Sequence, residues 1–376
     1  MDFALNDEQE MLKKSASDFL KSECPKSVVR QLEESDSGYS GQLWKKMAQL
    51  GWMGILIPEE YGGVGRTLIE EAVLFEEFGR AAMPGPMFAT LMGTLVVLEG
   101  AAEGLKKNLL TRVAAGDLVL TLAIDEPEAA CDPRFVSTRA TRKGGAYALS
   151  GTKLFVPFAH IAGCLLVVAR TAGAPADGKG VALFAVDAET PGIKLTAMKT
   201  FAHDKQFQVD FDGASVSSDR AVRKPGGVVS MINAVFEKAT AVQCASMVGG
   251  AQQELEMTAE YTKKRIQFGR PIGTFQAVQH RLADMFIDVQ AARLTTYQVV
   301  WRLSEGIPAA RELAIAKAVT GRACQRVAFS AQQLHGGIGV DMDGDLHFYY
   351  LREKALELTL GTPADHLKAL AAMIGA

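Results

Sequence analysis

The spacing of hydrophobic residues changes twice along the chain, and these changes restrict the possible folds more than any other feature. In the first part, Leu12, Ala16 and Phe19 follow a helical repeat. In the middle, short runs rich in branched and aromatic residues replace it, and Phe207 and Phe211 alternate with polar residues as in a half-buried strand. In the last part the helical repeat returns. We therefore predict an α+β multi-domain fold with an N-terminal helical domain at 1–117, a central antiparallel β-barrel or sandwich at 118–225 and a C-terminal four-helix bundle at 226–376.

Composition and charge exclude several classes of protein. The chain has 376 residues, of which 48% are hydrophobic, so it is long enough to bury more than one core. Its net charge of -3 gives no reason to expect a nucleic acid as partner. The start lacks the residue order of a signal peptide, and prolines and glycines interrupt the uncharged run at 81–98. We therefore predict a cytoplasmic protein that does not insert into a membrane.

We predict no metal site and no disulfide. The acidic residues of the segment 341–345 have the spacing of a calcium loop, but Leu346 stands where such a loop needs glycine and Arg352 where it needs glutamate. The cysteines are scattered without a C-x-x-C pair, which is typical of buried, reduced thiols. They are Cys24, Cys131, Cys164, Cys244 and Cys324.

The stretch 261–285 contains the first candidate site. It has the pattern of a helix end, a tight loop and a new helix: Gly269 and Pro271 break the first helix, and Thr274 is a candidate N-cap of the second. The loop presents a guanidinium, an aromatic ring and an amide together, from Arg265, Phe268 and Gln276. This set suits a phosphate-bearing cofactor, because arginine offers a fork to phosphate and a flat face for stacking. An ordinary helical hairpin with a surface arginine is the alternative.

A second candidate segment runs from Gln333 to Gly339 and contains Gly336 and Gly337. Its glycines follow a helix, whereas the glycines of a dinucleotide-binding turn precede one. A glycine C-cap explains one of them, and close approach of the backbone to a ligand explains the others better.

Both segments resemble signatures of the acyl-CoA dehydrogenase family. The first is similar to R-x-Q-F-G-x-P-I-x-x-x-Q-x-x-x-x-x-L-A-D-M, and the second to Q-x-x-G-G-x-G. The predicted order of helices, β domain and helical bundle matches this family over nearly the whole chain.

The resemblance implies an FAD-dependent enzyme that introduces an α,β double bond into an acyl-CoA thioester. In the family a carboxylate takes the α proton, and the β hydrogen passes as hydride to the flavin. Two segments of each chain reach the FAD of a neighbouring subunit, which implies a tetramer, and electron-transfer flavoprotein or a similar protein accepts the electrons. The implied flavin contacts are Arg265, Phe268, Gln276, Gln333, Gly336, Gly337 and Thr362.

The chain departs from the family at both known positions of the catalytic base. The usual base is the glutamate of a Y-E-G-T segment, where this chain has Leu360. Other members carry the glutamate on the first helix of the bundle, where this chain has Ala239. Leu360 keeps a backbone N–H that can polarise a carbonyl, but its side chain cannot accept a proton. The catalytic residue is therefore unknown, and candidates for a relocated base are Glu237, Asp341, Glu357 and Asp365.

The β region also differs from the family's sequence pattern. Pro157 stands where the family has a serine or threonine whose hydroxyl commonly bonds the flavin, and proline offers neither hydroxyl nor N–H. Of the family's T-E-P-x-A-G-S-D segment, only Glu126, Pro127, one alanine and Asp132 are kept. The segments that reach a neighbour's flavin are thus intact, and those that hold the chain's own flavin are eroded.

Three functional hypotheses follow. The first is a base-lacking subunit of a hetero-oligomeric acyl-CoA dehydrogenase whose homologous partner supplies the glutamate. The second is a self-sufficient acyl-CoA dehydrogenase with a relocated carboxylate. The third is a flavin-dependent monooxygenase on the same fold, which needs no base for an α proton. A purely structural or regulatory relative is the remaining alternative.

Overall fold

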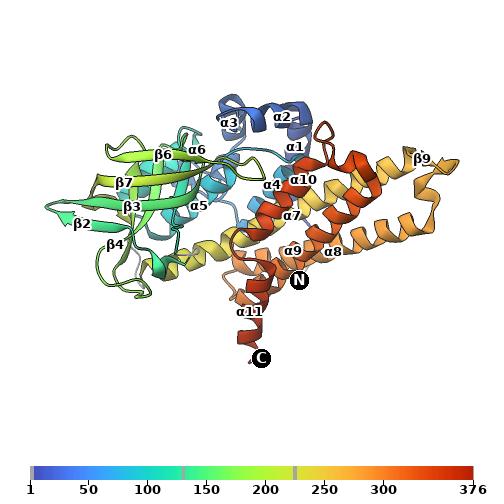
Figure 1. Cartoon of the computed structure of the whole chain (residues 1–376). Coiled ribbons are helices and arrows are strands. Elements are labelled where there is room, and N and C mark those ends of the chain that lie inside the picture. Colours follow the sequence, from blue (N-terminus) through green and yellow to red (C-terminus); the bar gives the residue numbers. More distant parts are fainter. Residues whose placement is uncertain (1–3, 129–131, 223–226, 376) are drawn as a thin grey trace. The chain divides into compact units, whose positions relative to one another are not determined.

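The computed structural model describes residues 4–128, 132–222 and 227–375. Contacts within the chain divide it into two compact units, and each unit joins segments that are far apart in the sequence (Figure 1). The first unit comprises Met1–Gln31, Thr67–Met83 and Thr240–Ala376, and the second comprises Leu32–Arg66 and Pro84–Ala239.

The N-terminal part is helical, as predicted. Its helices are α1 (Asp7–Glu23), α2 (Lys26–Glu34), α3 (Gly41–Gln49), α4 (Leu68–Ala81), α5 (Met87–Gly100) and α6 (Glu103–Ala114). Asn6 and Gln9 form a capping box at the start of α1, with hydrogen bonds of 2.9 and 3.0 Å. Pro84 and Gly85 separate α4 from α5, so the uncharged run at 81–98 forms parts of two helices. Among the described residues, no helix is long and apolar enough to cross a membrane.

The second unit contains a mixed β-sheet. Its strands are β1 (Leu120–Ala123), β2 (Arg139–Lys143), β3 (Ala146–Pro157), β4 (Cys164–Arg170), β5 (Val181–Asp187), β6 (Ile193–Met198), β7 (Gln206–Ser217) and β8 (Ala221–Val222). Within the described residues their order is β6-β7-β3-β2-β4-β5-β8, with β1 beside β4. β1 and β2 pair with β4 in parallel, and the other neighbours are antiparallel. The central β domain is therefore confirmed, but the sheet is open and not a closed barrel, since β6 and the two-residue β8 are its edges.

The C-terminal part of the chain is a bundle of long helices, as predicted (Figure 1). Its elements are α7 (Val228–Lys264), β9 (Ile266–Gln267), β10 (Arg270–Pro271), α8 (Gln276–Ser304), α9 (Ala310–His335), α10 (His347–Leu358) and α11 (Pro363–Met373). The core contains methionine, alanine, leucine and valine side chains from α7, α8 and α9, such as Met247, Val289 and Val327. α4 crosses α7 in close backbone contact, because a Cβ atom on Gly79 would lie only 1.9 Å from the carbonyl oxygen of Ser246.

The prediction of Thr274 as an N-cap is wrong. α8 begins at Gln276 with Phe275 as its N-cap residue, and Ile272–Thr274 forms a 3-10 turn before it. The Thr274 hydroxyl donates to the carbonyl oxygen of Pro271 at 2.7 Å, so it closes this turn instead of capping the helix. Pro271 fixes the entry to the turn, and the helix therefore starts one residue later than a cap at Thr274 requires.

The cysteine prediction is confirmed for four residues. Cys24, Cys164, Cys244 and Cys324 are buried and have free thiols. Burial raises the pKa of the Cys164 thiol to about 12, so this thiol stays protonated at neutral pH. Cys131 lies outside the described residues.

Candidate functional site

The predicted cofactor loop is a two-residue β-hairpin that follows α7 directly. Phe268 and Gly269 connect β9 to β10 with φ angles of 55° and 78°. Positive φ at both central residues is the requirement of a type I′ turn, and phenylalanine is unfavourable in that conformation. The Phe268 side chain is 92% exposed, and the edge of its ring faces Phe275 at a centroid distance of 6.0 Å. The turn therefore holds a large apolar ring in solvent.

The two predicted flavin-contact segments lie at the same end of the bundle. The Tyr261 ring near the end of α7 stacks on the His335 ring at the end of α9, with centroids 4.3 Å apart, and its hydroxyl donates to the His335 carbonyl oxygen at 3.4 Å. We call the residues 265–276 and 333–340 the bundle tip. It contains six of the predicted flavin contacts, namely Arg265, Phe268, Gln276, Gln333, Gly336 and Gly337, and all six are exposed.

The glycines of the bundle tip have different physical roles. Gly336 ends α9 with φ 64° and ψ -141°, a conformation open essentially to glycine alone. Gly339 packs closely, because a Cβ atom there would lie 2.9 Å from the Gln332 carbonyl oxygen. A Cβ atom on Gly337 would meet no atom of the described residues within 4 Å. The packing of the chain itself therefore does not explain Gly337, whereas close approach of a ligand from outside would.

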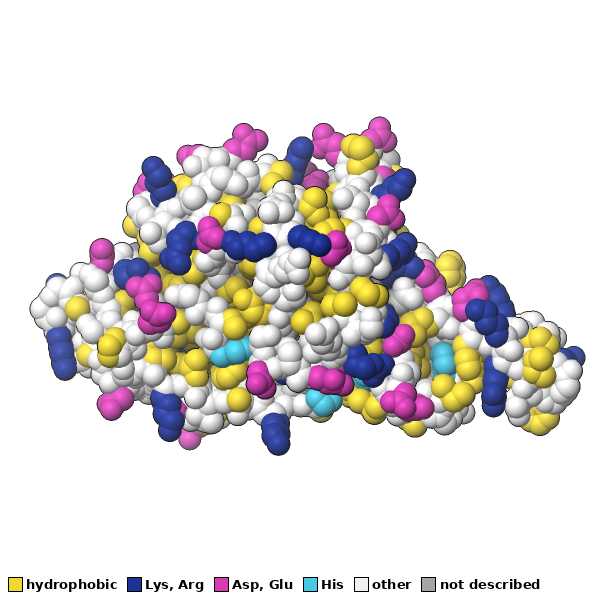
Figure 2. All heavy atoms as spheres, turned by 90° about the horizontal axis from the view of Figure 1, so that it is seen from above, with side chains coloured by type: hydrophobic (Ala, Val, Ile, Leu, Met, Phe, Trp, Pro, Cys, Tyr) yellow, Lys and Arg dark blue, Asp and Glu magenta, His cyan; other side chains and the backbone are white. Residues whose placement is uncertain are grey.

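Hydrophobic side chains are exposed at the bundle tip. In Figure 2 hydrophobic side chains are visible at the right-hand end, where Figure 1 places β9, as well as over the middle of that face. Ile266, Phe268, Ile338 and Val340 are each at least about half exposed. Apolar side chains that gather at one exposed end mark a site of contact with another molecule.

The remaining predicted flavin contact, Thr362, lies elsewhere in the bundle. Its hydroxyl caps α11 by accepting from the backbone N–H of Asp365 at 3.2 Å. The next residue, Pro363, packs on Gly321 in the middle of α9. The distance from Gly321 to His335 along the helix axis is about 21 Å at 1.5 Å per residue. The structure thus separates Thr362 from the bundle tip.

The turn around Leu360, which the sequence predicts to correspond to the family's main base position, is held by two polar side chains. Leu360 has φ 57°. Its carbonyl oxygen lies 3.0 Å from Nε2 of His366. The ammonium group of Lys317 donates to the carbonyl oxygens of Leu356 at 2.6 Å and Thr359 at 2.9 Å, and to Oε1 of Gln243 at 2.6 Å. The buried Lys317 therefore places a positive charge at the carbonyl end of α10, where the helix dipole favours it.

Ala239, predicted to correspond to the family's second base position, lies in a buried part of α7. Ala239 is fully buried in α7, and the following residue, Thr240, is buried as well. Neither side chain can accept the proton of a carbon acid at neutral pH.

The β-domain segment around Pro157 also lacks the expected donor. β3 bulges between Lys153 and Val156, and within the bulge Phe155 has φ 51° and is half exposed. The Pro157 carbonyl oxygen accepts a hydrogen bond of 2.6 Å from the Thr121 hydroxyl. The bulge thus presents the Phe155 ring, and the residue at the predicted donor position, Pro157, has no hydroxyl.

A buried ion pair anchors this bulge. Lys153 Nζ lies 2.6 Å from Glu126 Oε1, and Ser137 and Thr138 donate to the same carboxylate from their backbone N–H groups at 2.7 and 3.0 Å. Burial alone would raise the pKa of Glu126, but the charge of Lys153 and these hydrogen bonds outweigh it and lower the pKa to about 2. The kept Glu126 therefore has a structural role.

Two buried glutamates in the bundle were not anticipated from the sequence. Glu254 of α7 and Glu353 of α10 are almost fully buried, and both carboxylate oxygens of Glu254 lack a hydrogen-bond partner among the described residues. Burial raises the pKa of Glu254 well above its usual range, and the nearby Glu353 raises it further. Burial also raises the pKa of Glu353 to about 8. Gly250 makes room for Glu353, since a Cβ atom there would lie 2.2 Å from its Oε1. The one sequence feature that could have indicated this buried pair is Gly250, four residues before Glu254 in an apolar stripe.

The four candidates for a relocated base differ in their surroundings. Asp365 completes the cap of α11, Glu357 pairs with Lys354 at 2.5 Å, and Asp341 accepts from the backbone N–H of Asp343 at 3.0 Å. Glu237 on α7 is half-buried, and this burial raises its pKa. Glu237 therefore combines partial burial with a pKa shifted towards that of a general base.

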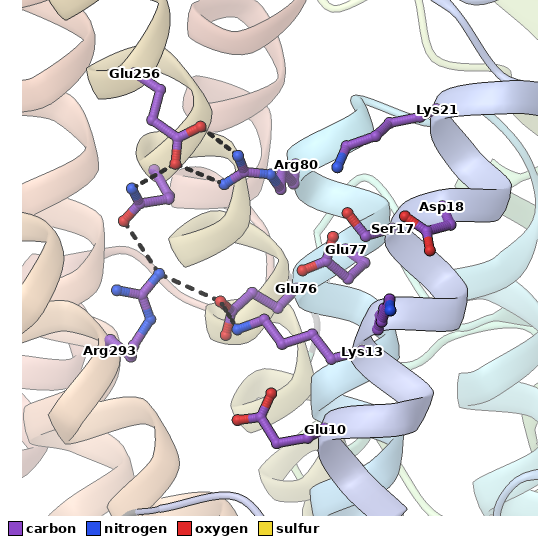
Figure 3. Close-up of a pocket in the computed structure, with 12 residues that line it drawn as sticks. Glu10, Lys13, Ser17, Asp18, Lys21, Glu76, Glu77, Arg80, Glu256 and Arg293 are labelled. Atoms are coloured by element: carbon purple, nitrogen blue, oxygen red, sulfur yellow. Dashed lines mark hydrogen bonds and ion pairs between the residues drawn. The ribbon is translucent and has the colours of Figure 1, made fainter.

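A polar groove of about 580 Å³ lies among α1, α4, α7 and α8 in the first unit (Figure 3). Glu76 on its floor accepts hydrogen bonds from Lys13 and Arg293 at 3.2 Å each and from the Tyr297 hydroxyl at 2.7 Å. Arg80 forms a two-bond fork with Glu256 on the wall. These charges neutralise one another, so we interpret the groove as a polar junction between helices and not as the substrate pocket.

Comparison with known proteins identifies the class to which this fold and these motifs belong. The family model described as acyl-CoA dehydrogenase, N-terminal domain, matches residues 6–117, the middle-domain model matches 121–213, and the C-terminal-domain model matches 226–375. The chain therefore belongs to the acyl-CoA dehydrogenase family. It is an oxidoreductase that acts on acyl-CoA thioesters, and its cofactor is FAD.

Individual relatives cover almost the whole chain. The acyl-CoA dehydrogenase FadE27 of Mycobacterium tuberculosis is 32% identical over 357 residues, which span 92% of this chain and 91% of FadE27. A structure of the ChsE4-ChsE5 complex of the same organism is similar with a TM-score of 0.90 and 30% identity, covering 100% of this chain and 99% of the matched one. A variant of the Tcur3481-Tcur3483 steroid ACAD is similar with a TM-score of 0.88 and 32% identity, covering 98% of each chain.

Proposed function

We propose that the chain is the base-lacking subunit of a hetero-oligomeric acyl-CoA dehydrogenase. The observation that carries this proposal is the absence of a carboxylate at both family positions, where Leu360 and Ala239 stand. FAD supplies the redox chemistry of α,β-desaturation when it is bound. A homologous partner chain would supply the glutamate that takes the α proton.

The two sets of predicted flavin contacts differ in how many family residues they keep, and this difference supports the proposal. The bundle tip keeps its arginine, aromatic ring, glutamines and glycines, and all of them are exposed. The segment that would hold the chain's own flavin has Pro157 in place of a hydroxyl donor. In the proposed assembly, residues at the tip contact a flavin bound by another chain, and the chain's own flavin segment lacks a donor at Pro157. The proposed assembly is a tetramer with the homologous chain.

Two similar structures suggest which substrates to assay first. ChsE4-ChsE5 is described as a complex, and Tcur3481-Tcur3483 is described as a steroid ACAD. CoA thioesters of steroid side chains are therefore the first substrates to assay, followed by CoA thioesters of dicarboxylic acids. An artificial electron acceptor can replace electron-transfer flavoprotein in this assay.

The test is to express the chain alone and together with a homologous chain that carries the family glutamate. We would measure FAD per chain, the mass of the oligomer and turnover. We expect the chain alone to be colourless or unstable, and the pair to gain flavin and activity together. Full dehydrogenase activity of the chain alone would contradict the proposal.

A self-sufficient enzyme with Glu237 as its base is the second candidate, because burial raises the pKa of this carboxyl group. If the chain alone is active, Glu237→Gln should abolish turnover while FAD stays bound. Glu357→Gln is the matched control, since Glu357 is paired with Lys354. Equal activity of both variants would exclude Glu237 as the base.

A further inference from the structure

Arg30 of α2 binds the loop that continues the bundle tip towards α10. Its guanidinium donates to the carbonyl oxygens of Met342 at 2.6 Å, Asp343 at 3.1 Å and Gly344 at 3.1 Å. It also approaches Oδ1 of Asp345 at 3.4 Å. Four oxygen atoms of one short loop therefore converge on a single side chain, in the segment whose acidic spacing resembles that of a calcium loop.

The side chain of Arg30 is itself fixed from a second direction. Its guanidinium carbon lies 5.0 Å from the centroid of the Phe348 ring, which is buried at the start of α10. The neighbouring Lys26 of α2 lies over the Tyr349 ring at 4.6 Å. α2 thus rests on the first turn of α10 through two cation–π contacts, beside the loop that Arg30 binds.

The loop in turn is tied to the glycine segment of the bundle tip. The backbone N–H of Asp341 donates to the Ile338 carbonyl oxygen at 3.2 Å, and that of Gly344 donates to the Asp341 carbonyl oxygen at 3.1 Å. The chain from Ile338 to Gly344 is therefore a series of linked turns. A displacement at Met342–Gly344 therefore has a hydrogen-bonded route to Ile338, next to Gly337, where a side chain would find open space.

We propose that Arg30 is a positioning residue for the flavin-contact segment Gly336–Val340. The inference rests on the proposed function, since it assumes that this segment contacts FAD. A guanidinium has five donors in one plane and can satisfy several carbonyl oxygens at once, whereas an ammonium group cannot match this planar arrangement. Without Arg30, the carbonyl oxygens of Met342, Asp343 and Gly344 lose their common partner and the turn opens.

The experiment uses the FAD-containing assembly in which the chain purifies, with its partner chain where one is needed. Arg30→Met removes the donors and keeps most of the side-chain volume, and Arg30→Lys keeps the charge. Arg80→Met is the matched control, because it also removes a guanidinium that forms a two-bond fork in the same unit, at Glu256 and outside the bundle tip. For each variant we would measure the FAD dissociation constant at 10 °C, the visible absorbance of the flavin and the melting temperature.

We expect Arg30→Met to weaken FAD binding at least tenfold and to shift the flavin absorbance, and Arg30→Lys to weaken binding by a smaller factor. Arg80→Met should change FAD binding less than twofold at a similar loss of melting temperature. Arg30 variants that bind FAD like the wild type would overturn the inference, as would an equal weakening by Arg80→Met. If Arg30→Met does not fold, unchanged binding by Arg30→Lys overturns it. A wild-type assembly without FAD would instead contradict the proposed function on which the inference rests.

Discussion

The replacement Glu353→Gln should change the pH dependence of stability in a defined way. The pKa of Glu353 is about 8 in the folded chain and about 4.5 for an exposed glutamate, because burial disfavours the charged form. Between these values the folded chain keeps a proton that the unfolded chain releases. The stability contributed by the protonated group is fully present below pH 4.5 and is lost as the pH rises through about 8. Glutamine stays neutral and avoids this loss.

The size of the effect follows from the pKa difference. Each pH unit between the two pKa values lowers the free energy of unfolding of the wild type by about 1.4 kcal/mol relative to the variant. From pH 5 to pH 8 the advantage of Glu353→Gln should therefore grow by about 3 kcal/mol.

Urea unfolding at pH 5, 6, 7 and 8, followed by circular dichroism, measures this difference. Glu10→Gln is the control, because Glu10 is an exposed glutamate of α1 and its replacement should give a nearly constant difference. A difference between Glu353→Gln and the wild type that stays constant from pH 5 to pH 8 would refute the reasoning, since it would mean that Glu353 has the same pKa in the folded and unfolded chains.

Three further predictions concern the site. Glu126→Gln should lower the free energy of unfolding by about 3–5 kcal/mol, because it leaves Lys153 buried without its charged partner, and denaturant titration of the β domain measures this. Lys317→Met should lower the free energy of unfolding by about 3 kcal/mol, because three hydrogen bonds from a charged donor are lost. Unchanged stability would show that the turn at Leu360 does not depend on Lys317. Phe268→Ala should leave the stability of the isolated chain within about 0.5 kcal/mol but weaken FAD binding in the assembly, measured by flavin fluorescence; equal binding would remove Phe268 from the contact surface.

The sequence predicted the periodic features of the fold well. Helical and β repeats identified the N-terminal helices, the β domain and the bundle, because burial of one face imposes these periods directly. The N-cap at Thr274 was wrong, since the choice among Thr274, Phe275 and Gln276 depends on the turn geometry after Pro271 and not on residue preference alone.

The parts of the site that depend on long-range contacts could not be predicted. Arg30 and Met342 are 312 residues apart, and no local pattern links them. Lys317 and Glu353 are charged residues in helices, where most charges are solvated, so their burial is visible only in the packed bundle. By contrast, the grouping of Arg265 and Gln333 at one end of the bundle followed from the family resemblance, and the stacking of Tyr261 on His335 gives its physical basis.

The turn at Phe268 has a consequence for protein engineering. A left-handed backbone costs a phenylalanine about 1 kcal/mol that glycine or asparagine would not lose. A screen for thermostable variants of the isolated chain should therefore enrich Phe268→Gly and Phe268→Asn early. Under the proposed function, the same variants would lose a ring that contacts the flavin of a second chain. Directed evolution of this protein should accordingly be scored on the complete assembly, because selection on the chain alone would favour loss of this ring.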